Sequence, residues 1–357
     1  MRYIINLTIF VVVDERTHRV NSILNDMKKI TIRDIAKEAG VSVGLASMVL
    51  NGKSGVSAKN MEKVRAVMKR LNYQPNKAAS VLRSGTRKTI GVITPDLSNH
   101  YFSEVSRHIE NVAYENGYTV LFGSSDERRD KISSLIDTFH SDGIQGILIT
   151  PAQDSRPEIE KALSLGMKIV MMNRQIDDIN DVGCVTLDNV KATDMAMEHL
   201  IANGYRNIEL VTNDNSLSTL VERIQAYKNY MADKGLEAIV SIVDENNTED
   251  LKNLLEEAKK RGTDAFLIPR GYLALYLCKA IHDNDYSIPE DFAVLGFDGG
   301  LNYRIMTPTV SQIIQSPQET AEESYRMLIE MMQNNIPGSR IFLQPSLEIG
   351  ESTKVKL

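Results

Sequence analysis

Cysteine is scarce in this sequence: the 357 residues include Cys184 and Cys278 and no other cysteine, and both lie in mostly apolar runs. We expect two reduced, buried thiols in a cytoplasmic protein. No CxxC pair or Cys/His cluster has metal-ligand spacing, so we predict neither a metal nor a cofactor. No apolar stretch reaches 18 residues, so we expect no membrane-spanning segment.

The sequence also lacks the short motifs of common catalytic sites. It contains no GxGxxG, P-loop, GxSxG or HExxH pattern, and its six histidines are scattered. We therefore expect a protein that is not an enzyme. An enzyme stays open as an alternative, because doubly wound folds host many activities.

Residues 1–26 differ from the rest of the chain. Tyr3–Val13 is a largely apolar run that is too short to span a bilayer. It resembles a signal-peptide core, but Asp14 and Glu15 follow directly and no small-x-small cleavage site appears. We expect Met27 to be the native start and residues 1–26 to be an extension.

The net charge of −6 argues, taken alone, against nucleic-acid binding, but its distribution indicates the opposite. Residues 27–88 hold 14 Lys and Arg against 3 Asp and Glu, and residues 89–357 hold 24 against 41. A basic module of net charge +11 on an acidic body of net charge −17 is typical of a polyanion-binding head. The length also predicts two or more domains.

Capping signals in the basic module predict three helices. Thr31 with Asp34 forms a capping-box-like start, and Gly40 suits the left-handed conformation that ends a helix. The expected helices with their caps are Ile32–Ala39 after Thr31, Val43–Leu50 after Ser42, and Ala58–Leu71 after Ser57.

The first two of these helices, joined by Ala-Gly-Val-Ser, predict a helix-turn-helix whose second helix enters the major groove of DNA. Val43, Gly44 and Met48 at its exposed start favour apolar readout of bases over bidentate guanine contacts. Phosphate contacts are expected from the hydroxyls of Thr31, Ser42 and Ser47. A plain three-helix bundle is the alternative, against which the charge of +11 argues.

Four segments together resemble the LacI/GalR family of bacterial repressors. They are residues 31–42 (TIRDIAKEAGVS), 47–52 (SMVLNG), 71–85 (LNYQPNKAASVLRSG) and 89–93 (TIGVI). The resemblance continues over roughly residues 28–350. The second helix departs from the family pattern, because Leu45 to Met48 replace the common Thr-Val-Ser-Arg, so the operator sequence does not carry over.

The resemblance implies that Asn76–Arg83 is a hinge helix that folds only on operator DNA, since eight residues are too few for a stable free helix. Leu82 is then an apolar wedge that kinks the duplex from the minor groove. The alternative is that Leu82 packs on the body. The family pattern also implies DNA contacts from Asn51, Tyr73, Asn76, Lys77, Ala79 and Arg83.

Short apolar runs alternate with helical patterns from residue 89 onward, which predicts parallel sheets covered on both faces. The number of runs favours two doubly wound lobes over one sheet. The resemblance implies the same fold, that of type I periplasmic binding proteins, with lobe crossings near residues 188, 316 and 350. The expected strands are Thr89–Ile93, Thr119–Phe122, Gly146–Ile149, Lys168–Met172, Cys184–Leu187, Asn207–Val211, Ala238–Val243, Ala265–Ile268 and Ala293–Gly296.

Ligands of such sheets bind beyond the carboxyl ends of the strands, which selects candidate residues directly. Polar groups between aromatic walls suit a sugar or a nucleobase. The candidates for binding an effector are Asp96, Asn99, Tyr101, Phe102, Ser124, Arg174, Arg223, Arg270, Phe297, Asp298 and Gln315.

The family pattern gives three of these candidates a role. Arg223 in ERIQAY matches an arginine that grips ligand hydroxyls or a carboxylate, and Asp298 in VLGFD matches an aspartate that accepts sugar hydroxyls. Gln315 matches a polar position beside the cleft. The alternatives are a surface ion pair for Arg223 and a loop cap for Asp298.

One departure from the family concerns the ligand. Arg270-Gly271 stands where the family often has Asn-Asp or Thr-Asp. An extra arginine in the cleft favours an anionic ligand, such as a sugar acid or a sugar phosphate. The alternative is that Arg270 pairs with an acidic neighbour such as Asp298.

Together these features predict a sequence-specific transcriptional regulator, most readily a repressor, that binds operator DNA as a homodimer or a higher oligomer and responds to a sugar-like effector. A pure ligand-binding transport receptor is the runner-up, and the basic module argues against it. The expected domains are residues 27–74 (helix-turn-helix), 75–88 (hinge and linker), 89–188 with 317–350 (N-terminal lobe) and 189–316 (C-terminal lobe).

Overall fold

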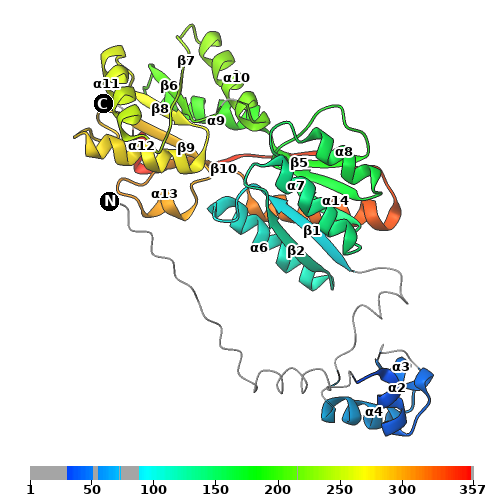
Figure 1. Cartoon of the computed structure of the whole chain (residues 1–357). Coiled ribbons are helices and arrows are strands. Elements are labelled where there is room, and N and C mark those ends of the chain that lie inside the picture. Colours follow the sequence, from blue (N-terminus) through cyan, green and yellow to red (C-terminus); the bar gives the residue numbers. More distant parts are fainter. Residues whose placement is uncertain (1–29, 51–54, 72, 74–87, 215, 355–357) are drawn as a thin grey trace, which may run out of the picture. The chain divides into compact units, whose positions relative to one another are not determined.

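The computed structural model describes residues 30–50, 55–71, 73, 88–214 and 216–354 (Figure 1). The chain divides into two compact units, residues 1–86 and 87–357, called here the head and the body.

Three helices form the head. They are α2 (Ile32–Ala39), α3 (Val43–Leu50) and α4 (Ala58–Arg70). The Thr31 backbone N–H donates to the Asp34 carboxylate at 2.8 Å, and Gly40 ends α2 with a φ of 66°. A small core of Ile35, Ala39, Val49, Val64 and Val67 holds the helices together. The predicted helices of the head are therefore present.

Two six-stranded sheets form the body, here called sheet A and sheet B. Sheet A has the order β11-β5-β4-β3-β1-β2, with every pairing parallel. Its strands are β1 (Thr89–Thr94), β2 (Thr119–Ser124), β3 (Gly146–Ile149), β4 (Lys168–Met172), β5 (Val182–Leu187) and β11 (Arg340–Leu343). Its helices are α6 (His100–Glu115), α7 (Arg129–Ser141), α8 (Arg156–Ser164) and α14 (Pro317–Asn334).

Sheet B has the order β12-β10-β9-β8-β6-β7, and only the β10–β12 pairing is antiparallel. Its strands are β6 (Ile208–Thr212), β7 (Ile239–Ile242), β8 (Ala265–Ile268), β9 (Ala293–Phe297), β10 (Ser311–Ile314) and β12 (Ser346–Glu348). Its helices are α9 (Asn189–Ala202), α10 (Ser218–Asp233), α11 (Thr248–Arg261), α12 (Gly271–Asp283) and α13 (Leu301–Ile305). A 3-10 turn, Glu351–Thr353, follows β12.

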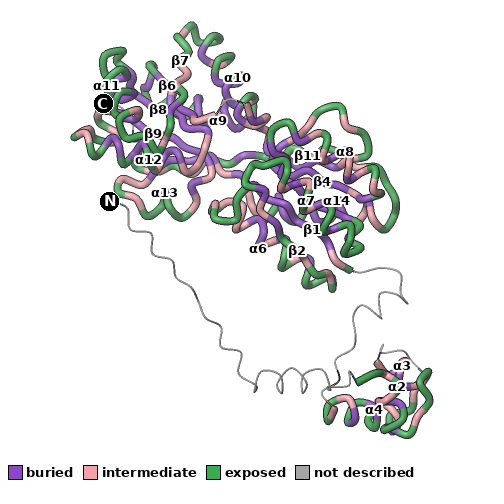
Figure 2. Tube along the Cα trace, viewed as in Figure 1, coloured by how far each residue is buried: buried purple, intermediate pink, exposed green. Residues whose placement is uncertain are grey.

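Helices cover both faces of each sheet, so the central strands are buried (Figure 2). In sheet A, α6 and α14 pack on one face and α7 and α8 on the other. In sheet B, α9 and α10 cover one face and α11 and α12 the other. The predicted two-lobed, doubly wound fold is confirmed.

The chain passes between the lobes three times: from β5 to α9, from β10 to α14, and from β11 to β12. The third crossing was expected near residue 350, and that position is wrong. Residues 346–348 already belong to sheet B, because β12 pairs with β10 over Gln312 to Ile314.

Candidate functional site

A cavity of about 730 Å³ lies between the carboxyl ends of the two sheets. Its walls come from loops that follow β1, β2 and β4 of sheet A and β6, β8, β9 and β10 of sheet B. The strand order reverses at β1 and at β6, which are the switch points where ligands of doubly wound sheets bind.

Nine of the eleven predicted effector residues line this cavity. They are Asp96, Asn99, Tyr101, Phe102, Arg174, Arg223, Arg270, Asp298 and Gln315. Asn173, which the strand-end rule also selects, lines the cavity as well. Among the other lining residues, the prediction did not include His100, Glu127, Thr219, Leu220, Tyr272, Leu275, Tyr276 and Asn302.

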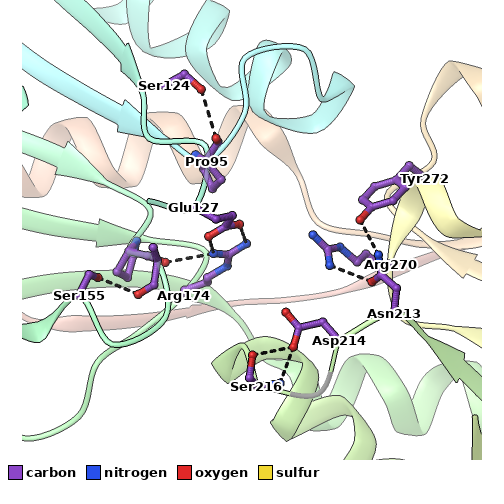
Figure 3. A network of polar contacts seen from close by, with 12 residues as sticks. Pro95, Ser124, Glu127, Ser155, Arg174, Asn213, Asp214, Ser216, Arg270 and Tyr272 are labelled. Carbon is purple, nitrogen blue, oxygen red and sulfur yellow. Dashed lines mark hydrogen bonds and ion pairs between the residues drawn. The ribbon is translucent and has the colours of Figure 1, made fainter. Parts of the chain in front are cut away.

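Ser124 and Phe297 were predicted to contact the effector, but neither lines the cavity. The Ser124 hydroxyl donates to the Pro95 carbonyl oxygen at 3.2 Å and lies 2.7 Å from the Asp126 carboxylate, so it ties two loops together (Figure 3). Phe297 is fully buried in the core of sheet B. The strand-end rule selected both because it locates a residue along the chain and not the direction of its side chain.

The acceptors that follow β1 are partly used within their own loop. The Asp96 carboxylate accepts the Ser98 N–H at 2.8 Å. Asn99 caps α6 by accepting the Tyr101 N–H at 3.0 Å. Both contacts fix the loop that forms this wall.

Asn173 and Tyr101 form a polar pair on the sheet A wall. The Asn173 amide donates to the Tyr101 hydroxyl at 2.6 Å, and that hydroxyl lies 3.1 Å from the Thr320 hydroxyl. Burial, together with the Asp298 charge, raises the pKa of Tyr101, which keeps the phenol neutral. Among the described residues, the buried Asn173 Oδ1 has no hydrogen-bond partner.

Arg174 is neutralised within the protein. Two of its nitrogens donate to the two Glu127 carboxylate oxygens at 2.8 Å each, and one also donates to the Pro151 carbonyl oxygen at 3.1 Å (Figure 3). A bidentate pair of this kind leaves little of the arginine charge for a ligand.

Arg223 is 7% exposed and is held from three sides. Its Nε donates to Asn189 Oδ1 at 2.8 Å and its Nη1 to the Pro269 carbonyl oxygen at 2.7 Å. Its guanidinium lies 4.2 Å from the centre of the Phe297 ring. The alternative of a surface ion pair for Arg223 is therefore wrong.

Asp298 directly follows β9 and has a left-handed backbone conformation, with a φ of 50°. Its carboxylate accepts the Gln315 N–H at 2.8 Å. Burial raises the pKa of Asp298 to about 6, although the Arg223 charge and the Gln315 N–H both favour the ionised form.

Arg270 does not pair with Asp298. Its Nη1 donates to Asn213 Oδ1 at 2.8 Å, and its guanidinium lies 4.9 Å from the centre of the Tyr272 ring (Figure 3). The Asn213 amide nitrogen in turn lies 2.7 Å from the Tyr272 hydroxyl and 2.8 Å from Glu245 Oε2. Neutral partners therefore orient Arg270.

A chain of hydrogen bonds that the sequence did not reveal connects Arg223, in the lobe of sheet B, to the lobe of sheet A. Glu222 accepts from Asn189 at 2.7 Å and from the Gln175 amide at 3.1 Å. Asn189 holds Arg223, whereas Gln175 follows β4 of the opposite sheet. The hydrogen bonds of Glu222 join residues that are far apart in the sequence, so no local sequence pattern predicts them.

In the head, the exposed start of α3 matches the predicted DNA-reading surface only in part. Val43 is 44% exposed, and Ser42 and Gly44 are exposed, while Ser47 and Met48 are half-buried. Ser42 Oγ accepts the Leu45 N–H at 3.1 Å, which leaves its hydroxyl proton free to donate to a phosphate.

Two further predicted DNA contacts have internal partners. The exposed Thr31 hydroxyl donates to Asp34 at 2.6 Å, and the half-buried Tyr73 packs against the head core. The predicted contacts Asn51, Asn76, Lys77, Ala79, Leu82 and Arg83 lie outside the described residues.

Within the described residues, no group of three or more His, Cys, Asp or Glu is placed to hold a metal ion. No helix in this described part is long and apolar enough to cross a membrane.

Comparison with protein families gives three matches. The model for periplasmic binding proteins and the sugar binding domain of the LacI family matches residues 87–271. A periplasmic binding protein-like domain matches residues 197–353, and the model for bacterial regulatory proteins of the lacI family matches residues 31–76.

Individual relatives span nearly the same length. The catabolite control protein A of Priestia megaterium is 28% identical over 333 residues, which covers 91% of this chain and 99% of that protein. The ribose operon repressor of Halalkalibacterium halodurans is 28% identical over 326 residues, with 91% and 97% covered.

A solved structure of the lac repressor dimer bound to operator and an anti-inducer matches with a TM-score of 0.82 at 23% identity, covering 92% of this chain and all of that one. A complex of the regulator CelR with cellobiose matches with a TM-score of 0.67 at 21% identity, covering 90% of this chain and 99% of that one. At these identities the structures support the fold.

Proposed function

Since the chain belongs to the LacI family of bacterial regulatory proteins, we propose that it is a transcriptional repressor whose affinity for operator DNA is set by a small effector bound in the body. It is proposed to act as a homodimer on near-palindromic sites, because a two-fold dimer reads two half-sites. The solved lac repressor complex is likewise a dimer on operator.

One observation carries this proposal: a basic helix-turn-helix head and a polar cavity at two sheet switch points occur in the same chain. The seven basic side chains described on α2 and α4 are all exposed; they are Arg33, Lys37, Lys59, Lys63, Arg65, Lys69 and Arg70. Such a surface supplies the salt-dependent part of DNA affinity, and the start of α3 supplies base contacts.

The cavity supports a hydroxylated effector. The Asp298 carboxylate and the unpartnered Asn173 Oδ1 are acceptors for ligand hydroxyls, and Tyr101 and Phe102 add aromatic surface. These features favour a sugar or a sugar derivative. The name of one relative, the ribose operon repressor, refers to a sugar, which is consistent with a sugar-like effector.

The effector is proposed to act by shifting the lobe arrangement. The cavity is lined by both lobes, so a ligand that binds one arrangement more tightly favours that arrangement. In a dimer this changes the spacing of the two heads and hence the DNA affinity. A coupling of roughly 1–3 kcal/mol corresponds to a change of about 5- to 150-fold.

The DNA-binding part is tested by two variants that add the same charge to the head. Val43→Glu places a carboxylate at the exposed start of α3, whereas Ala66→Glu places one on an exposed position of α4. Fluorescence anisotropy on duplexes selected from a random pool should show that Val43→Glu abolishes selective binding and that Ala66→Glu retains it. Equal losses in the two variants would contradict a base-reading role for α3.

A further inference from the structure

We propose that the effector carries an anionic group, a carboxylate or a phosphate, that binds to Arg270 at the start of α12. This inference rests on the proposed function and specifies the class of effector that the cavity selects.

The three arginines of the cavity differ in how their charge is balanced. Arg174 is fully paired with Glu127. Arg223 lies beside Asp298: burial lowers the pKa of Arg223, and the charge of Asp298 opposes that shift. Arg270 forms no ion pair with a carboxylate among the described residues, and Glu245 is reached only through Asn213.

Arg270 is nevertheless fixed in place. The Asn213 amide oxygen accepts from one of its nitrogens, and the Tyr272 ring lies beside its guanidinium. Figure 3 shows the side chain extending from the sheet B side towards the Arg174–Glu127 pair across the cavity. The remaining N–H groups are therefore preoriented donors, and this suits a planar or tetrahedral oxyanion.

The start of α12 adds positive potential at the same place. Arg270 is the residue that precedes this 13-residue helix; its side chain does not cap the helix, and the first turn of the helix contains no acidic residue. Gly271 lets the helix start approach the β9 end, because a Cβ there would lie 2.7 Å from the Phe297 carbonyl oxygen. The helix dipole favours an anion at this end.

A second part of the ligand is indicated by Asn173, which is 6% exposed and lines the same cavity. Its Oδ1 has no partner among the described residues and requires a hydrogen-bond donor. An acceptor on one wall, and on the other an arginine that forms no ion pair among the described residues, fit one molecule that has both hydroxyls and a negative charge. Sugar phosphates and sugar acids share this chemistry.

The test uses the full chain and matched probes in thermal shift and titration calorimetry: glucose, glucose 6-phosphate and gluconate; ribose and ribose 5-phosphate; and inorganic phosphate. We expect at least one charged sugar to bind more tightly than its neutral counterpart, with an affinity that falls as salt rises. The phosphate and carboxylate arms identify which anion is preferred.

Arg270→Gln keeps a donor for Asn213 and removes the charge, so it should lower the affinity for the charged probe roughly 10- to 100-fold. Arg326→Gln is the matched control, because Arg326 lies on an exposed part of α14 outside the cavity, and it should leave the affinity unchanged. Arg270→Lys should restore part of the binding.

The proposal is overturned if no charged probe binds, if neutral sugars bind more tightly than their charged counterparts, or if Arg270→Gln leaves the affinity for the charged probe unchanged. Inorganic phosphate binding alone, with no charged sugar bound, also overturns it. Each of these results leaves selective DNA binding by the head intact, so failure of this inference is distinguishable from failure of the proposed function.

Discussion

Replacing Arg223 by lysine tests whether this arginine both binds the effector and supports the cavity wall. Arg223 donates from two different nitrogens to Asn189 and to the Pro269 carbonyl oxygen, and it stacks on Phe297. Lysine retains the charge, but its single ammonium cannot reproduce the two directions of the planar fork.

The expected cost follows from these contacts. Loss of one charge-assisted hydrogen bond costs about 1.5–3 kcal/mol, and loss of the stacked guanidinium costs about 1 kcal/mol. We therefore expect Arg223→Lys to lower the free energy of unfolding of the body by about 2–4 kcal/mol. Arg223→Ala should be worse, because it leaves both acceptors buried and unpaired.

Urea denaturation followed by circular dichroism measures the stability, and calorimetry measures the affinity for whichever sugar or sugar derivative binds the wild type. The affinity should fall by roughly 10- to 100-fold, because one charge-assisted contact is worth about that factor. Selective DNA binding without effector should persist. Unchanged stability together with unchanged effector affinity would refute both roles of Arg223.

Four further predictions concern the cavity and the linker. Because the pKa of Asp298 is raised to about 6, the folded state holds this proton more tightly than the unfolded state. Wild type should therefore lose about 2 kcal/mol of stability relative to Asp298→Asn as the pH rises from 4 to 6.5, and a difference in melting temperature that does not change with pH would contradict this. Effector affinity of the wild type should fall as the pH drops through 6, because the carboxylate acceptor becomes protonated. Glu222→Gln leaves one of the two donors, Gln175 or Asn189, without an acceptor. The ratio of operator affinities with and without effector should therefore change several-fold from the wild-type ratio. A ratio equal to that of the wild type would show that Glu222 does not take part in the coupling. Leu82→Ala should weaken specific operator binding far more than non-specific binding, and equal loss in both would reject the wedge role.

Local signals in the sequence were sufficient for the head and most of the body. Caps such as Thr31 and Gly40 fix helix ends through contacts within a few residues of each other, and buried parallel strands appear as continuous apolar runs. The last three strands were not predicted. Strand β10 begins with the polar pair Ser311 and Gln312. Strands β11 and β12 are short and, apart from Leu343, exposed or half-buried, so neither apolar runs nor alternation marks them.

The sequence predicted which strand ends supply the cavity residues, but not how the side chains of those residues pair with one another. The strand-end rule placed Arg174 and Arg270 in the same cleft. It did not reveal that Glu127 neutralises Arg174, whereas the neutral Asn213 only orients Arg270. These partners lie 47 and 57 residues away in the sequence. Charge compensation across loops depends on tertiary packing, so sequence spacing carries no information about it.

The most direct test of the account is the affinity of the full chain for its selected operator, measured by anisotropy with and without the effector that stabilises the body, at two salt concentrations. We expect a salt-sensitive preference for that duplex over random competitor and an effector-dependent change in operator affinity of about 5- to 150-fold. It would be contradicted if the protein preferred no duplex sequence, or if a ligand that saturates the cavity left the operator affinity unchanged.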